Sequence, residues 1–183
     1  MLKELSKYVV IGIAAGIVAY LFTTKESVSI SVANNNQKEV TAASNSYNEI
    51  YRSVKDSVVT INTDRGRGSG VIITDQGHIV TNEHVINGAK KIRIITSENI
   101  SYSASIVGVD KITDIALLKS SYIGKALTFS DSSKVKIGDI VLAIGNPFGV
   151  GQTLTQGIIS RTNSGHITAN PLDEFLQSDA AIN

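Results

Sequence analysis

The chain has 183 residues, of which 42% are hydrophobic and 18% are charged, so it is long enough for one ordinary hydrophobic core with an appendage. Its formal net charge of +1, without a run of basic residues, argues against a nucleic-acid partner. The absence of cysteine excludes disulfides and thiolate metal sites, and leaves the redox compartment undecided.

The N-terminal residues 1–24 contain an apolar stretch without charge, from Tyr8 to Thr24. As a helix that rises about 1.5 Å per residue it would span roughly 26 Å, which suits a thin or locally adapted bilayer. Lys3 and Lys7 precede the stretch, which favours a cytoplasmic N-terminus with the remainder exported. Bulky residues at its end favour an uncleaved anchor over the alternative, a cleaved signal peptide. We therefore expect one N-terminal transmembrane helix.

A polar segment, residues 25–46, follows and is rich in Ser, Asn, Thr and Lys, without any aromatic residue. Such a composition cannot bury enough apolar surface to fold alone, so we expect a flexible linker. After it, Tyr47, Ile50, Tyr51 and Val54 recur at helical spacing, which predicts an amphipathic turn or two packed on the body of the protein.

From Ser57 onward the pattern is typical of β-structure, and the expected fold class is all-β. Short apolar runs separated by Gly, Asn and Asp account for a six-stranded barrel, at residues 58–61, 71–73, 79–80, 92–95, 102–109 and 115–118. The turn residues Thr74 to Gly77 join the second run to the third as a hairpin. After a polar connection at residues 130–136, further strand-like runs follow at 140–144, 154–159 and 175–177.

Two side chains beside these strands have the chemistry of an acid–base pair. His84 follows the third run, where a rigid strand can hold an imidazole in a fixed direction, and is the candidate base. Asp114 opens the sixth run, where a buried carboxylate needs a donor such as an imidazole N–H. Asp110 competes for this role, but beside Lys111 it has the pattern of a solvated turn. The alternative for His84 is a hydrogen-bonded structural residue.

Six stretches form an ordered pattern: GSGVII at 68–73, TNEHVI at 81–86, TDIALLK at 113–119, GDIVLAIGNPF at 138–148, QTLTQGIIS at 152–160 and FLQSDAAIN at 175–183. In order and spacing they resemble the HtrA/Deg family of trypsin-like serine proteases, and within it the membrane-anchored DegS type. The resemblance covers about residues 47–183. It implies a trypsin-like double β-barrel, with residues 47–129 as the first barrel and 130–183 as part of the second. It also implies that His84 is the catalytic base and Asp114 its orienting acid.

The pattern departs from the family at its C-terminal end. In the family, the motif Asp-Ala-Ala-Ile-Asn, here residues 179–183, is followed by the motif Gly-Asn-Ser-Gly-Gly, which supplies the nucleophile and the oxyanion-hole donors. The Gly-Asn-Ser-Gly-Gly motif is absent from the 183 residues, and neither Ser69 nor Ser164 has a family counterpart as nucleophile. We therefore expect these residues alone to be inactive, with the nucleophile beyond Asn183 and no PDZ domain among them.

The resemblance further implies an acyl-enzyme mechanism on a protein or peptide substrate, such as a membrane-bound regulator of an envelope-stress response. It implies a single-pass protein of the bacterial inner membrane with its protease domain in the periplasm, and a homotrimer when full length. Tyr47 or Tyr51 would serve the trimer contact, or else simple core packing. No cofactor is implied, and His78, His84 and His166 lack the spacing of a metal site.

Two interpretations from other classes stay open. One is an inactive, truncated, membrane-anchored fragment that acts at most as a binding module. The other is a tethered scaffold in which His84 and Asp114 are only a satisfied polar pair.

Overall fold

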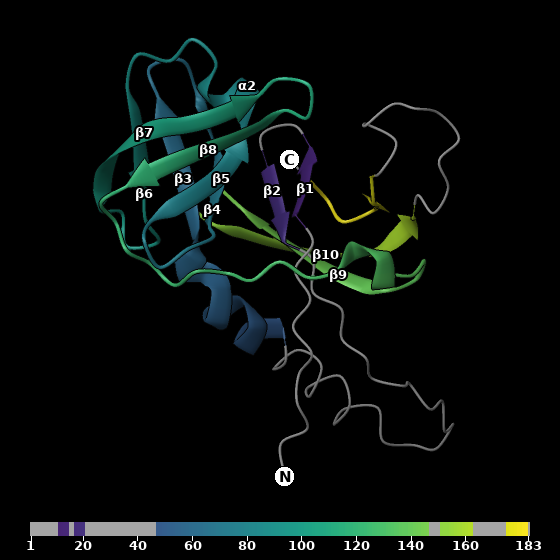
Figure 1. The fold of residues 1–183 in the computed structure, drawn as a ribbon. Coiled ribbons are helices and arrows are strands. Elements are labelled where there is room, and N and C mark those ends of the chain that lie inside the picture. The colour runs from purple at the N-terminus through teal and green to yellow at the C-terminus, as the bar shows by residue number, and fades with distance from the viewer. Residues whose placement is uncertain (1–10, 15–16, 21–46, 147–150, 163–174, 183) are drawn as a thin grey trace, which may run out of the picture.

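A closed barrel of antiparallel strands forms the larger part of the protein (Figure 1). The computed structural model describes residues 11–14, 17–20, 47–146, 151–162 and 175–182. The barrel closes in the order β3-β4-β5-β8-β7-β6, which confirms the predicted six-stranded barrel. Its strands are β3 (Val58–Thr63), β4 (Arg67–Ile72), β5 (His78–Asn82), β6 (Ile92–Ile95), β7 (Ser101–Asp110) and β8 (Ile115–Ser120).

The interior of this barrel is filled by β-branched and leucine side chains from alternate strand positions. Ile61, Ile72, Ile79, Ile94 and Leu118 are fully buried in a single cluster. Each such side chain contributes about 1.5–3 kcal/mol when it is removed from water. The barrel therefore gives β5 and β8 a rigid inner support.

The hairpin of β4 and β5 forms as the sequence predicts. The strands pair with Val71 opposite Val80 and Ile72 opposite Ile79. The turn is closed by a hydrogen bond from the Gly77 N–H to the Thr74 carbonyl at 3.2 Å. Gly77 has a φ of +84°, and a Cβ there would lie 2.5 Å from the carbonyl oxygen of Ser120. Only glycine fits this position without strain.

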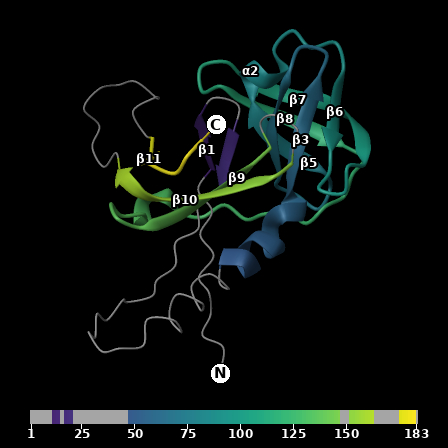
Figure 2. The same cartoon turned by 180° about the vertical axis from the view of Figure 1, so that it is seen from behind.

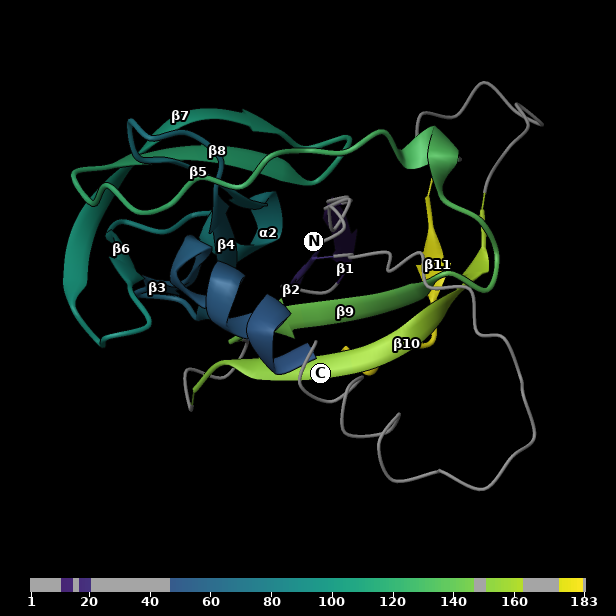
Figure 3. The same cartoon turned by 90° about the horizontal axis from the view of Figure 1, so that it is seen from below.

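The predicted amphipathic helix is present at residues 47–54, and a 3-10 turn, η1 (Lys55–Ser57), leads from it into β3. Ile50 and Val54 are buried in a cluster that they share with Val58 of the barrel. The cluster also contains Leu142 and Ile144, which belong to a second sheet outside the barrel. The helix therefore packs where the barrel meets that sheet (Figure 3).

The second sheet has the order β11-β10-β9 and is antiparallel. Its strands are β9 (Ile140–Gly145), β10 (Thr153–Arg161) and β11 (Gln177–Ser178), and a 3-10 turn, η2 (Ser132–Lys134), precedes them. Val141, Ala143 and Ile159 form a small core of their own with Val135 and Ala180. β9 and β10 fall on runs that the sequence predicts, while β11 shares only Gln177 with the predicted run at 175–177.

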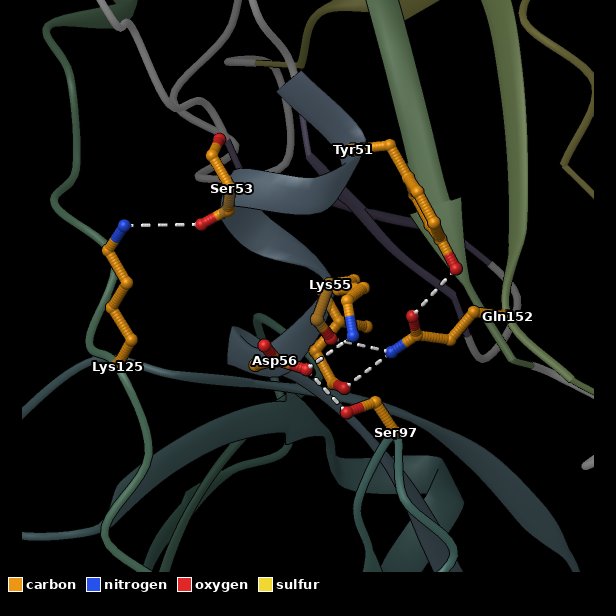
Figure 4. Close-up of polar contacts among 8 residues, drawn as sticks. Tyr51, Ser53, Lys55, Asp56, Ser97, Lys125 and Gln152 are labelled. Atoms are coloured by element: carbon orange, nitrogen blue, oxygen red, sulfur yellow. Dashed lines mark hydrogen bonds and ion pairs between the residues drawn. The ribbon is translucent and has the colours of Figure 1, made fainter. Parts of the chain in front are cut away.

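Gln152, just before β10, links the second sheet to the start of the barrel (Figure 4). Its Nε2 donates to the carbonyl oxygens of Lys55 at 2.7 Å and Val58 at 2.8 Å. The hydroxyl of Tyr51 donates to Gln152 Oε1 at 3.3 Å. A single side chain thus satisfies two backbone carbonyls where the helix enters β3.

The N-terminal segment differs from its prediction. Within the stretch expected to be a transmembrane helix, β1 (Ile11–Ala14) and β2 (Ile17–Tyr20) pair as antiparallel strands. β2 lies alongside β9 of the second sheet (Figures 1 and 2). Isoleucine and valine, which are frequent here, favour strands because their branched Cβ restricts χ1. In the part of the chain that the structure describes, no helix is long and apolar enough to cross a membrane.

Several predictions concern residues outside the described ranges. They are the flexible linker at 25–46, the ends of the proposed anchor, and Ser164 and His166.

Candidate active site

The candidate site lies where β5 ends and β8 begins. The two strands pair antiparallel with Asn82 opposite Ile115, so the residues just beyond β5 lie beside Asp114. The Glu83 N–H donates to the Asp114 carbonyl at 3.1 Å and extends this pairing by one step. His84 then lies in α2 (Glu83–Ile86), a single helical turn.

This arrangement brings His84 and Asp114 into contact. His84 Nδ1 lies 2.6 Å from Asp114 Oδ2, and the His84 backbone N–H donates to Oδ1 at 2.9 Å. Because an ionised carboxylate can only accept, the hydrogen of this contact belongs to Nδ1, which leaves Nε2 for another partner. The expectation of a buried carboxylate is wrong, since the side chains of His84 and Asp114 are 47% and 41% exposed.

Asp114 is held in its ionised form. Partial burial raises the pKa of this carboxyl, but hydrogen bonds from the Asn82 amide and from the backbone and ring of His84 outweigh it. The net pKa therefore lies below the usual value for aspartate. A charged acceptor is thus present opposite the imidazole at neutral pH.

Asp110, the competing acid, serves the turn between β7 and β8. Its Oδ1 accepts from the backbone N–H of Ile112 at 2.9 Å, which lowers its pKa together with a hydrogen bond from Thr113. The same turn ends at Asp114, whose φ of 57° is in the left-handed region. The structure therefore brings Asp114, and not Asp110, to the histidine.

The other predicted candidates do not join this pair. Ser69 is fully buried, and its Oγ accepts from the backbone N–H of Asn146 at 2.8 Å, which links β4 to the end of β9. His78 Nδ1 lies 2.8 Å from Thr74 Oγ1 inside the hairpin turn. Both side chains have structural partners in the fold.

Asn82 is a residue of the site that the sequence analysis passed over. Its amide Nδ2 donates to Asp114 Oδ2 at 2.9 Å, while its own side chain is fully buried. The only available signal was its place two residues before His84, and such a position is common for residues that merely end a strand.

The described residues offer no candidate for a metal centre, because their His, Asp and Glu side chains do not gather in groups of three. An open cavity lies elsewhere, against the helix at residues 47–54, and its lining includes neither His84 nor Asp114. It is lined by Tyr47, Asn48, Tyr51, Gln152 and Leu154.

Comparisons with known proteins agree with this fold. The model of the trypsin-like peptidase domain family matches residues 68–183. Among solved structures, the HtrA-type protease AlgW with a tripeptide aligns with a TM-score of 0.68 at 39% identity, over 75% of this chain and 47% of that one. The serine endoprotease from Yersinia pestis aligns with a TM-score of 0.65 at 40% identity, over 75% and 49%.

Curated relatives have the same character. Serine endoprotease DegS of Salmonella typhimurium is 44% identical over 146 residues, which are 78% of this chain and 40% of the relative. Periplasmic pH-dependent serine endoprotease DegQ of Escherichia coli is 43% identical over 121 residues, which are 64% and 27%. The chain thus spans less than half the length of these relatives. From this match and fold, the chain belongs to the trypsin-like peptidase family and is similar within it to HtrA-type proteases.

Proposed function

We propose that the protein acts as a serine endopeptidase of the DegS type, in which His84 is the general base and Asp114 its orienting acid. The observation that carries this proposal is the 2.6 Å contact between His84 Nδ1 and Asp114 Oδ2 on a half-exposed surface. An acid at Nδ1 fixes the imidazole so that Nε2 faces outward as a proton acceptor. The family membership supplies the reaction type.

In this mechanism Nε2 of His84 takes the proton of a serine hydroxyl as its oxygen attacks the scissile carbonyl carbon. The resulting imidazolium is stabilised by the Asp114 carboxylate and then gives its proton to the leaving amine as the C–N bond breaks. Water, deprotonated by the same imidazole, attacks the acyl-enzyme and releases the second product. We assign the nucleophile to residues that follow Asn183.

The substrate class and setting follow from the relatives and from the sequence. An HtrA-type structure holds a tripeptide, which supports a protein or peptide substrate for this chain. From the resemblance to the DegS type we further propose a membrane-bound stress regulator as that substrate, and a trimer of the full-length protein. The relative named periplasmic, together with the uncharged stretch after Lys7, supports a periplasmic protease domain anchored in the inner membrane.

If a Gly-Asn-Ser-Gly-Gly sequence follows Asn183 in the gene, the test uses the gene product extended through that sequence. His84→Ala and Asp114→Asn are expected to lower kcat/KM for a peptide by about 10⁴-fold, because the hydroxyl is no longer activated. His78→Ala, a histidine bound within the hairpin turn, is the matched control and keeps activity within about threefold. Unchanged proteolysis by His84→Ala would contradict the proposal.

The DNA sequence after the codon for Asn183 tests the rival function, an inactive anchored binding module. If the codon after Asn183 is a stop codon, no nucleophile follows, and an inactive anchored binding module is favoured. In either case we expect the 183 residues alone not to be labelled by a serine-directed fluorophosphonate, because His84 has no serine to activate among them.

A further inference from the structure

Asn82 and His84 share one oxygen of the Asp114 carboxylate. The Asn82 amide donates to Oδ2 at 2.9 Å, and His84 Nδ1 lies 2.6 Å from the same atom. Asn82 is the last residue of β5 and is fully buried, whereas His84 and Asp114 are half-exposed. The least exposed of the three side chains therefore contacts the carboxylate oxygen that faces the imidazole.

The backbone of Asp114 needs support at this position. Its φ of 57° is left-handed, a conformation that aspartate adopts more readily than most residues but still at some cost. The Asp114 carbonyl oxygen accepts from the Glu83 N–H at 3.1 Å and from Asn82 Nδ2 at 3.4 Å. The Asn82 amide thus contacts both the backbone and the side chain of Asp114.

Without Asn82, His84 alone would donate to the carboxylate, through its backbone N–H and its ring. The His84 backbone N–H fixes Oδ1, but the χ2 torsion of aspartate is broad, so Oδ2 could still turn out of the imidazole plane. The Asn82 amide is the donor outside His84 that removes this freedom. The reverse amide orientation would set Asn82 Oδ1 against a carboxylate oxygen, so Nδ2 is the atom that faces Asp114.

An unpaired oxygen on Asn82 supports a role for its amide donor, Nδ2. Its Oδ1 is buried and lacks a hydrogen-bond partner among the described residues. A buried acceptor left in this state destabilises the fold, so an apolar residue would suit the interior better. Other charged groups of this corner are directed elsewhere: Asp110 accepts from its own turn, and the Glu83 carboxylate accepts from Asn87 at 3.5 Å.

We propose that Asn82 is a positioning residue, whose side-chain amide holds the Asp114 carboxylate in the orientation that keeps the hydrogen of His84 on Nδ1. This inference rests on the roles proposed above for His84 and Asp114. Asn82 does not reach the reacting atoms itself, and it acts through the carboxylate. Its loss is therefore expected to change the tautomer of His84 before it changes the fold.

The test is NMR of the whole chain with ¹⁵N-labelled histidine, in which His84→Gln assigns the His84 signals. In the wild-type chain we expect the Nδ1–H tautomer, with a downfield proton that disappears only when acid protonates Asp114. In Asn82→Ala and in Asn82→Leu, which keeps the volume without the donor, the Nε2–H tautomer should rise at least fivefold. The pH at which acid removes the downfield proton should also rise, because a donor that lowers the pKa of Asp114 is lost.

Asn87→Ala is the matched control, since Asn87 is an exposed asparagine one turn further on and its amide contacts Glu83. It should leave the His84 tautomer unchanged. A wild-type tautomer in both folded Asn82 variants would overturn the inference, and so would unfolding of both, which would make Asn82 a structural residue. A wild-type chain without the downfield proton would instead contradict the pairing of His84 and Asp114, and with it the proposed function.

Discussion

The left-handed conformation of Asp114 turns the end of a β-turn into part of the candidate site. Asn99 is the other non-glycine residue with a positive φ in the described ranges, and it lies in a turn between β6 and β7. At Asp114 the conformation directs the carboxylate back across the strand pair to α2, where two donors of His84 meet it. A backbone torsion that is unfavourable by itself is therefore offset by charge-assisted hydrogen bonds.

Gly77 is a second residue whose backbone conformation limits which amino acid can occupy the position. Alanine there would adopt an unfavourable positive φ and place Cβ against the carbonyl oxygens of Ser120 at 2.5 Å and Tyr122 at 2.7 Å. We predict that Gly77→Ala lowers the free energy of unfolding by about 2–4 kcal/mol, measured by urea denaturation.

The control for this prediction is Gly66→Ala. Gly66 also lies in a turn, but a Cβ there meets no atom within 4 Å, and its φ is not in the left-handed region. This variant should stay within about 0.5 kcal/mol of the wild type. Equal stability losses in the two variants would contradict the steric explanation.

At the scale of elements, the barrel and the second sheet are joined by side chains that satisfy backbone groups. Asn146, after β9, donates its backbone N–H to Ser69 Oγ at 2.8 Å and its Nδ2 to Thr60 Oγ1 at 2.7 Å. Gln152, just before β10, donates its side-chain amide to the backbone carbonyls of Lys55 and Val58. These bonds fix the ends of β9 and β10 to β3 and β4, and so set the position of the second sheet beside the barrel.

Gln152 offers the sharper test of this linkage (Figure 4). We predict that Gln152→Ala lowers the free energy of unfolding by about 1–3 kcal/mol, because the partly buried Val58 carbonyl loses the Gln152 amide and the Lys55 carbonyl retains one donor, the Val58 N–H, instead of two. Gln156→Ala, which changes an exposed glutamine of β10, is the control and should change the free energy of unfolding by less than about 0.5 kcal/mol. If thermal and urea unfolding do not distinguish the two variants, Gln152 has no such linking role.

At the scale of the whole molecule, the N-terminal segment is the element whose environment decides its structure. In the structure its two short strands pair with each other, and β2 lies alongside β9. In a bilayer the same residues would have to satisfy every backbone group internally, which a helix does and a two-stranded hairpin does not. The proposed anchor therefore requires a helix there.

Membrane extraction tests this proposal. We predict that the chain, expressed in bacteria, stays in the membrane pellet after alkaline carbonate treatment. Ile13→Arg should release it, because arginine near the centre of a span costs about 2.5–3.5 kcal/mol. Ser31→Arg, outside the uncharged stretch, is the control and should remain in the pellet. Complete extraction of the wild-type chain would contradict the anchor.

The sequence by itself determined the strands of the barrel, because alternating β-branched runs between turn residues specify strands locally. The hairpin at Thr74 to Gly77 and the helix at residues 47–54 were predicted for the same reason, since each depends on contacts within a few residues. The residue types of His84 and Asp114 also pointed to a pair, though their contact spans thirty positions.

The tertiary structure alone decided which atoms meet. The pairing of β5 with β8 set Asn82 opposite Ile115, and this register brought the Asn82 amide and His84 to the same oxygen of Asp114. It also left Asp114 half-exposed, against the expectation from its position before a buried strand. At Ile11–Ala14 and Ile17–Tyr20 the structure has paired strands where the sequence predicts a helix, because a continuous apolar run without periodicity suits a helix or a strand equally, and neighbouring elements decide between them.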